Sequence, residues 1–85
     1  MSFQGKEIPV APLDRILHQE WAERVSEDAS RLLRDIVESV ARAIAREACE
    51  LARHAGRKTV TKEDVEFAAR RLFMRPSIFS WTVKE

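Results

Sequence analysis

The segment between Ser26 and Ala55 constrains the fold most, because it contains neither glycine nor proline and its apolar residues recur every three or four positions. That period is typical of one face of an α-helix. Ser26 is a favourable N-cap, and the acidic residues directly after it suit a helix N-terminus. The pattern ends at Gly56, which suits the left-handed position just past a helix C-terminus. The sequence therefore predicts one helix of about 29 residues, roughly 43 Å long at 1.5 Å per residue.

A short basic loop follows this helix and leads directly into the start of another helix. Thr61 is a favourable N-cap, and Asp64 three residues later completes the spacing of a capping box. Arg57 and Asp64 flank the loop, so an ion pair between them can hold it. Because Pro76 disfavours helix at the residue before it, we expect the helix to span about 62–73. Its expected inward-facing residues are Val65, Ala68, Ala69 and Leu72.

The N-terminal part of the chain predicts an irregular arm and one short helix. Residues 1–10 show no apolar period and include the helix-breaking Pro9. Pro12 suits the first turn of a helix. Apolar residues then recur at helical spacing, which predicts a short helix that ends at about Glu20 or Trp21.

The C-terminal part has a different pattern. Phe79, Trp81 and Val83 alternate with polar residues, a period of two that is typical of a short strand. The chain therefore divides into three parts, which are an N-terminal arm (1–10), a helical domain (11–74) and a C-terminal extension (75–85).

One copy of the chain cannot cover its own long helix. A compact domain of 85 residues has a radius of gyration of about 12 Å, hence a diameter of roughly 30 Å. The central helix is longer than that, and two short helices cannot bury its apolar stripe. A second copy can do so if it crosses the helix near its midpoint, at the small residues Ala41, Ala43, Ala45 and Ala48. The sequence therefore predicts an intertwined helical dimer.

The net charge alone does not indicate a partner. The chain has 15 Lys plus Arg against 14 Asp plus Glu, a formal net charge of +1. Affinity for nucleic acid depends on the cations that reach phosphates rather than on this sum. Basic residues gather around the loop, and others lie near the first helix. The positions of the basic residues therefore permit a nucleic-acid interface, although the net charge does not predict one.

Composition argues against several other classes of protein. The single cysteine, Cys49, excludes an internal disulfide and fits a reducing compartment. His18, His54 and Cys49 do not have zinc-ligand spacing, so we expect no metal. No phosphate-binding glycine loop or nucleophile–base pair can be assembled, so we expect neither an enzyme nor a cofactor. Without a signal segment or a long apolar run, the protein is expected to be cytoplasmic, with no membrane partner.

These features together resemble an archaeal-type histone. The loop segment 54–65, preceded by Arg24-Val25-Ser26, carries the resemblance, which extends over about residues 8–73. The resemblance implies an all-α histone fold, with a short helix, a long central helix and a short helix. It also implies that two copies cross at their central helices as a handshake dimer.

The resemblance implies binding and compaction of double-stranded DNA at the chromosome, without reading of the sequence. In a handshake dimer, the loop after the central helix of one chain lies beside the loop before that helix in the other chain. The two loops then form a row of phosphate contacts that bends or wraps a duplex. The DNA-binding residues that it implies are Arg15, Arg24, Ser26, Lys58, Thr59 and Lys62. Taken singly, each of these cations is also typical of a solvated surface.

The resemblance also implies a contact by which dimers join into tetramers or longer arrays. Its residues are Leu51, His54, Asp64 and Phe67, with His54 bonded to Asp64 of a neighbouring dimer. The simpler interpretation of His54 is an exposed histidine at a helix C-terminus. The alternative function is that of a histone-fold subunit that pairs with a different histone-fold chain in a transcription-type complex and contacts DNA little.

Three positions depart from the family pattern. The family has small residues where Asp14 and Trp21 stand, notably glycine at position 21, and often has lysine where His18 stands. An indole that points outward at position 21 would obstruct the stacking of successive turns of a DNA superhelix. We therefore expect short, discrete DNA complexes. The alternative is that Trp21 packs on Phe79 or Trp81 of the C-terminal extension.

Overall fold

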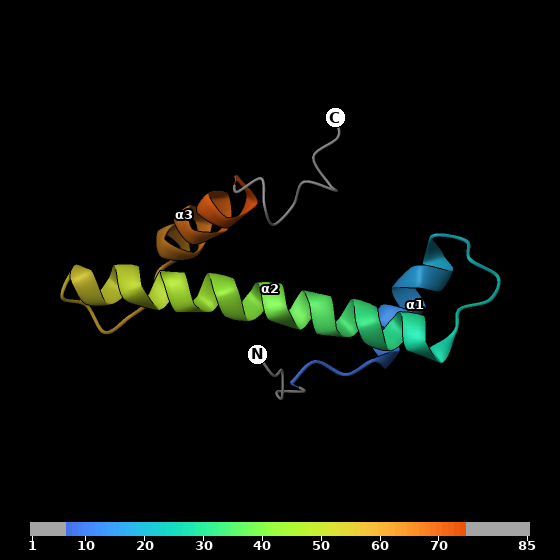
Figure 1. The fold of residues 1–85 in the computed structure, drawn as a ribbon. Helices are drawn as coiled ribbons and strands as arrows, with labels where there is room; N and C mark the ends of the chain where they lie inside the picture. The colour runs from blue at the N-terminus through green and yellow to red at the C-terminus, as the bar shows by residue number, and fades with distance from the viewer. Residues whose placement is uncertain (1–6, 75–85) are drawn as a thin grey trace. The chain divides into compact units, whose positions relative to one another are not determined.

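The computed structural model describes residues 7–74 of the chain and contains three helices in that range (Figure 1). They are α1 (Ala11–Gln19), α2 (Glu27–His54) and α3 (Lys62–Phe73). The predicted short, long and short helices are therefore confirmed, as is the all-α class. The strand expected around Trp81 lies outside the described residues. Within residues 7–74, none of the helices has the length and apolar character that crossing a bilayer requires.

The end of α1 differs from the prediction by one or two residues, because a left-handed residue stops the helix. Trp21 has a φ of 56°. Its N–H donates to the carbonyl of His18 at 3.0 Å, and the N–H of Ala22 donates to the carbonyl of Leu17 at 3.4 Å. These two hydrogen bonds form a Schellman motif with Trp21 in the position that glycine usually fills. Tryptophan gives no sequence signal for such an end, so the predicted helix was too long.

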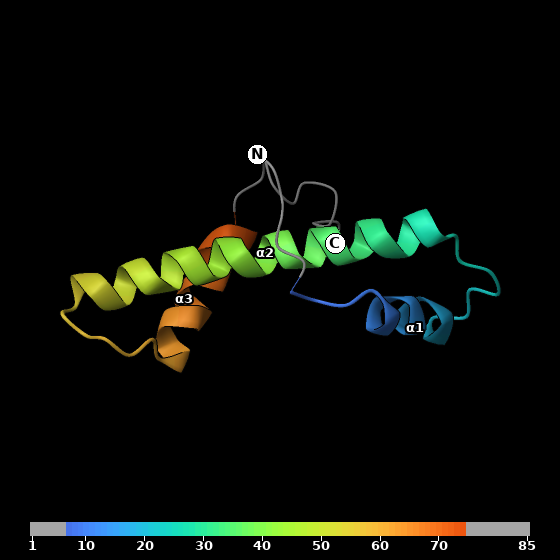
Figure 2. The same cartoon turned by 90° about the horizontal axis from the view of Figure 1, so that it is seen from below.

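The chain divides into two compact units, and the boundary lies between Ala41 and Arg42. In the first unit, α1 lies beside the first part of α2, as both views show (Figures 1 and 2). Leu13 of α1 is buried, and the buried Ser30 of α2 donates a hydrogen bond to Asp14 at 2.8 Å. The bond gives the Asp14 carboxylate a partner on α2.

A buried carboxylate anchors the segment before α1. Glu38 of α2 is 2% exposed, and its two oxygens accept the backbone N–H groups of Glu7 at 3.0 Å and Ile8 at 3.1 Å. Arg34 donates to the Ile8 carbonyl at 3.1 Å. Residues 7 and 8 are therefore tied to α2 through their backbone, although the sequence suggested only an irregular arm.

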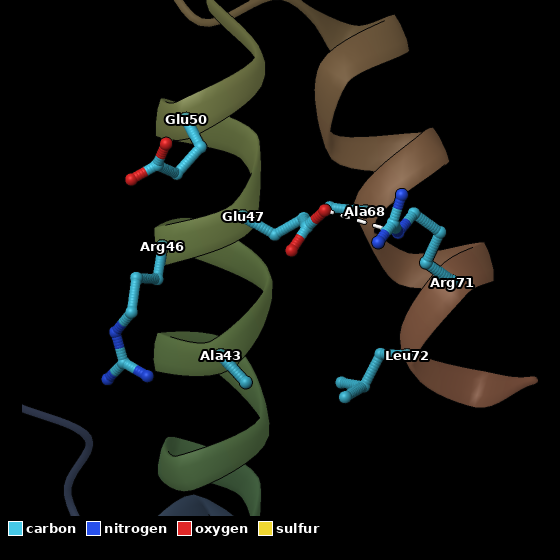
Figure 3. Close-up of a pocket in the computed structure, with 7 residues that line it drawn as sticks. All are labelled: Ala43, Arg46, Glu47, Glu50, Ala68, Arg71 and Leu72. Carbon is cyan, nitrogen blue, oxygen red and sulfur yellow. Dashed lines mark ion pairs between the residues drawn. The ribbon is translucent and has the colours of Figure 1, made fainter. Parts of the chain in front are cut away.

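In the second unit, α3 packs along the last part of α2 through small residues (Figures 1 and 2). Ala48 and Ala52 of α2 and Ala68 of α3 are buried, so the two helices approach closely. Arg71 of α3 pairs with Glu47 of α2 at 3.2 Å across an open pocket of about 260 Å³ (Figure 3). The pocket shows that α3 alone does not fill the space beside α2.

The end of α2 agrees with the prediction. Gly56 has a φ of 74°. Its N–H donates to the carbonyl of Arg53 at 2.9 Å, and the N–H of Arg57 donates to the carbonyl of Ala52 at 2.9 Å. This is a second complete Schellman motif, here with glycine in the left-handed position.

Several large apolar side chains are exposed within residues 7–74. Val65 is 44% exposed, so the prediction that it faces inward is wrong for the single chain, although Ala68 is buried and Ala69 and Leu72 are half-buried. The other exposed apolar residues of the helices include Ile16, Leu32, Ile36, Val37, Phe67 and Phe73. Much of the apolar stripe that the sequence predicts is thus uncovered by the chain itself.

Candidate nucleic-acid interface

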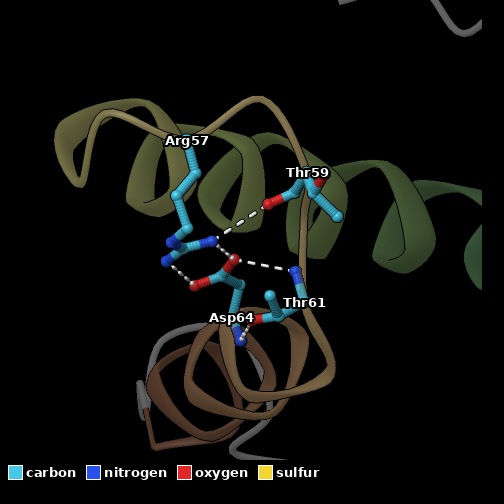
Figure 4. A network of polar contacts seen from close by, with 4 residues as sticks. All are labelled: Arg57, Thr59, Thr61 and Asp64. Atoms are coloured by element: carbon cyan, nitrogen blue, oxygen red, sulfur yellow. Dashed lines mark hydrogen bonds and ion pairs between the residues drawn. The ribbon is translucent and has the colours of Figure 1, made fainter.

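The loop between α2 and α3 is held by one arginine–carboxylate pair (Figure 4). Arg57 donates from Nη1 to Oδ2 of Asp64 at 2.9 Å and from Nη2 to Oδ1 at 3.0 Å. Nη1 also donates to the carbonyl of Thr59 at 2.9 Å. The two parallel bonds fix the guanidinium in one orientation, and the third bond ties the tip of the loop to it.

The same carboxylate caps α3. Oδ2 of Asp64 accepts the N–H of Thr61 at 2.9 Å, and Oγ1 of Thr61 accepts the N–H of Asp64 at 3.3 Å. This confirms the predicted capping box. The hydrogen bond from Arg57, together with the N–H of Thr61, holds the pKa of Asp64 well below its ordinary value, and the bond to Asp64 raises the pKa of Arg57. In this loop lock, as we call the Arg57–Asp64 pair, the Asp64 side chain is only 7% exposed and the Arg57 side chain 39%, so the carboxylate is the shielded partner.

This network leaves the tip of the loop exposed. Arg57 and Asp64 bond to each other, whereas Lys58 and Thr59 are exposed between them in the sequence. Lys62 is exposed in the first turn of α3. The loop and the first turn of α3 thus present two lysines and a hydroxyl on a backbone that hydrogen bonds hold in place, so little backbone entropy is lost when they bind.

The loop between α1 and α2 ends at a cap. The Oγ of Ser26 accepts the N–H of Ala29 at 3.1 Å, which confirms Ser26 as the N-cap. Because this oxygen acts as an acceptor within the chain, the hydroxyl proton is the group that Ser26 can donate to an external anion. Arg24 is exposed two residues earlier.

The cations of the two loops differ from most other basic residues of the chain. Arg31, Arg53, Arg70 and Arg71 each pair with a glutamate at 2.9–3.2 Å, and Arg34 pairs with Asp35 at 2.8 Å. Within residues 7–74, no side-chain hydrogen bond or ion pair involves the four cations that the sequence assigned to DNA or the exposed Arg46. The four are Arg15, Arg24, Lys58 and Lys62. Their charges are therefore available to an external anion.

His18 is bound within the chain, unlike these cations. Its Nδ1 lies 3.0 Å from the carbonyl of Ala22, and its Nε2 lies 3.6 Å from Asp14. Both ring nitrogens thus have neighbours in the first unit.

The four residues assigned to dimer–dimer contact all lie in the second unit. His54 is 81% exposed at the end of α2, with its Nε2 3.6 Å from Glu50. Phe67 is exposed on α3 with Arg71 over its ring, and Leu51 is half-buried. Asp64, by contrast, already accepts three hydrogen bonds. Each carboxylate oxygen has room for two donors, so only Oδ1 retains acceptor capacity for a histidine from elsewhere.

Trp21, which the sequence comparison marked as a departure from the family pattern, is exposed. Its side chain is 85% exposed in a conformation that bulky residues rarely adopt. The expected obstruction of superhelix stacking needs an exposed indole, and the indole is exposed. The obstruction itself stays a prediction. The other expectation for Trp21, packing on Phe79 or Trp81, involves residues outside the described range.

Comparison with known proteins agrees with this arrangement. Residues 6–69 match the family described as histone-like transcription factor (CBF/NF-Y) and archaeal histone. The archaeal histone HAN1 of Thermococcus zilligii is 50% identical over 64 residues, which is 75% of this chain and 96% of that protein. Probable archaeal histone 3 of Methanocaldococcus jannaschii has the same identity and coverage. The chain belongs to the histone-fold family of archaeal histones and histone-like transcription factors.

Proposed function

We propose that this protein binds double-stranded DNA as a dimer, without sequence preference, and bends or wraps it. The observation that carries the proposal is that the basic residues divide into a paired and an unpaired group. Arg15, Arg24, Lys58 and Lys62 are exposed and make no ion pair within residues 7–74, whereas most other arginines of that range pair with acidic residues. Unpaired cations neutralise phosphates well, because no internal ion pair has to be broken first.

A dimer supplies the arrangement that the contacts need. Exposed apolar residues such as Ile36, Val37 and Val65 can be covered by a second copy. In a handshake dimer, Arg24 of one chain lies beside Lys58 and Thr59 of the other, once at each end. Two such ends form a curved row of phosphate contacts. The names of the relatives, both archaeal histones, support the same association with the chromosome.

The experiment is a comparison of DNA affinities among three variants on random-sequence duplexes. Arg24→Ala and Lys58→Ala each remove an unpaired cation, and both are expected to weaken binding on all sequences alike. The matched control is Arg31→Ala, because Arg31 is exposed on α2 but pairs with Glu27 at 2.9 Å. The control is expected to bind almost as the wild type does. Equal affinities for all four proteins would refute the assignment of the loops.

Assembly beyond the dimer is proposed to use His54 and Phe67, both exposed in the second unit. His54→Ala is the cleaner probe, because Asp64→Ala also removes the partner of Arg57. His54→Ala is expected to shorten nuclease-protected DNA fragments and leave the dimer folded. Unchanged fragments would show that dimers act singly or join elsewhere.

A second function, that of a heterodimeric transcription-type subunit, is favoured by the near-neutral charge and by the transcription factors in the matched family. It predicts that the chain alone remains unfolded and folds only with a different histone-fold chain. Circular dichroism of the purified protein distinguishes the two functions, because the proposed homodimer is helical without any added partner.

A further inference from the structure

We propose that Trp21 makes an apolar contact in a groove of the bound duplex, beside the phosphate contact of Arg24. The inference rests on the proposed function and adds a residue to its interface. It follows from the backbone, the exposure and the location of this one side chain.

The first observation is that Trp21 is held in an unfavourable conformation. Its φ of 56° places it in the left-handed region, which residues with a Cβ atom avoid. The two hydrogen bonds of the Schellman motif, from Trp21 to His18 and from Ala22 to Leu17, hold it there. Glycine would make the same turn without steric cost. The indole therefore does not serve the turn in which it lies.

The second observation is that the other residues between 7 and 74 do not bury the indole. It is 85% exposed, the highest exposure among the large hydrophobic residues of the described chain. An exposed tryptophan contributes almost no burial to folding. A costly backbone conformation that displays a large aromatic group indicates a contact outside residues 7–74.

The third observation is the position of Trp21 in the proposed interface. The loop is fixed at one end by the Schellman motif and at the other by the cap at Ser26. Arg24 lies three residues after Trp21, so their Cα atoms are at most about 11 Å apart. A rigid loop thus carries an exposed indole and an unpaired guanidinium close together. Arginines in the minor groove are often accompanied by an apolar side chain that wedges against the bases.

The neighbouring charges define the kind of contact. Glu20 and Glu23, on either side of Trp21, are exposed. Their carboxylates repel phosphates, so the contact that we propose for Trp21 is made by the face of the ring with bases or sugars. Such a contact changes affinity without releasing counterions. It is therefore distinguishable from the contacts of the cations by its response to salt.

The test begins with fluorescence. The chain has two tryptophans, so Trp81→Phe leaves Trp21 as the single emitter. In this variant the free dimer is expected to show a red-shifted emission that acrylamide quenches readily. A random-sequence duplex is expected to protect the indole from acrylamide. Protection that grows with protein concentration in the absence of DNA would mean that a second copy covers Trp21, and would overturn the proposal.

The second part of the test is the affinity of Trp21→Gly. This substitution relieves the backbone, so weaker binding cannot be attributed to unfolding, which circular dichroism verifies. We expect a loss of about tenfold in affinity, within the range of one aromatic–base contact, with an unchanged slope of log K against log salt. Trp21→Phe should retain most of the affinity. Arg24→Ala is the matched control, because it should lower the slope by about 0.9 for each phosphate contact that is lost.

The outcomes separate this proposal from the proposed function. If the wild type binds DNA and Trp21→Gly binds equally well, the contact of Trp21 is refuted and the proposed function stands. If the wild type does not bind DNA, both fail. If Trp21→Gly lowers the salt slope as Arg24→Ala does, the residue acts through the loop's cations rather than by an apolar contact, and the proposal is also wrong.

Discussion

At the scale of single residues, Asp64 organises the loop between α2 and α3. One carboxylate accepts two hydrogen bonds from Arg57 and one from Thr61, so it joins the loop to the start of α3. These donors bind the charged form of the group, which is why its pKa is low. The exposed Lys58 and Thr59 depend on this lock for their position. Protonation of Asp64 removes acceptor capacity from the carboxylate and therefore weakens its pairing with Arg57.

The lock predicts a specific acid sensitivity. Because the folded pKa of Asp64 lies below its ordinary value of about 3.9, its contribution to stability is fully present above that value and is lost as the pH falls through the folded pKa. Asp64→Asn is therefore expected to be less stable than the wild type at neutral pH, with a gap in the free energy of unfolding that narrows below about pH 4. Urea denaturation at several pH values measures the gap. A gap independent of pH would show that the charge of Asp64 is not what holds the loop.

At the scale of the elements, the chain ends two helices with the same motif but with different residues. Gly56 after α2 and Trp21 after α1 both take the left-handed position of a Schellman motif. No atom lies within 4 Å of the place where a Cβ of residue 56 would stand. The cost of a side chain there is therefore a cost of the backbone alone.

This comparison predicts opposite effects of two substitutions. Gly56→Ala is expected to destabilise the protein by about 1–2 kcal/mol, the cost of a left-handed residue with a Cβ. Trp21→Gly is expected to be neutral or stabilising by up to about 1 kcal/mol, because the relieved strain exceeds the added entropy of the unfolded glycine. Denaturant unfolding of both variants checks the pair. A destabilised Trp21→Gly dimer without DNA would mean that the indole is packed against protein.

The sequence predicted best what depends on neighbouring residues. The N-caps at Ser26 and Thr61 and the stop at Gly56 are local, so the limits of α2 and α3 followed from short patterns. The pairing of Arg57 with Asp64 was likewise visible from the loop between them.

Features that depend on distant contacts or on steric tolerance were not predictable. Glu38 bonds to the backbone of residues 30 and 31 positions earlier, which no local pattern indicates. Trp21 has a left-handed backbone conformation, which tryptophan rarely adopts, so its residue type did not indicate it. The unpaired state of Arg24 could not be foreseen either, because Glu23 lies next to it in the sequence.

At the scale of the whole molecule, large apolar side chains of α2 and α3 remain exposed within residues 7–74. Leu32, Ile36 and Val37 of α2 and Val65 of α3 are all exposed by more than a third. Large exposed apolar patches are uncommon on soluble monomers. We therefore expect folding to be coupled to dimer formation.

The coupling predicts a melting temperature that rises with protein concentration. Ile36→Lys should destabilise the dimer by about 2 kcal/mol or more, because it places an unpaired charge at the buried surface. Ser39→Lys is the matched control, since Ser39 is an exposed polar residue of the same helix. Melting curves over a wide concentration range, with sedimentation to establish the mass, test the prediction. A melting temperature that does not vary with concentration, for a protein that sediments as a monomer, would contradict the dimer.

The salt dependence of DNA binding tests the central claim most directly. If Arg15, Arg24, Lys58 and Lys62 of two chains each neutralise a phosphate, the dimer makes about eight phosphate contacts. The slope of log K against log salt should then be about −7, with the same value on duplexes of unrelated sequence. Titrations of the wild-type protein at several salt concentrations measure it. A slope near zero, or binding that is confined to one sequence, would contradict the account.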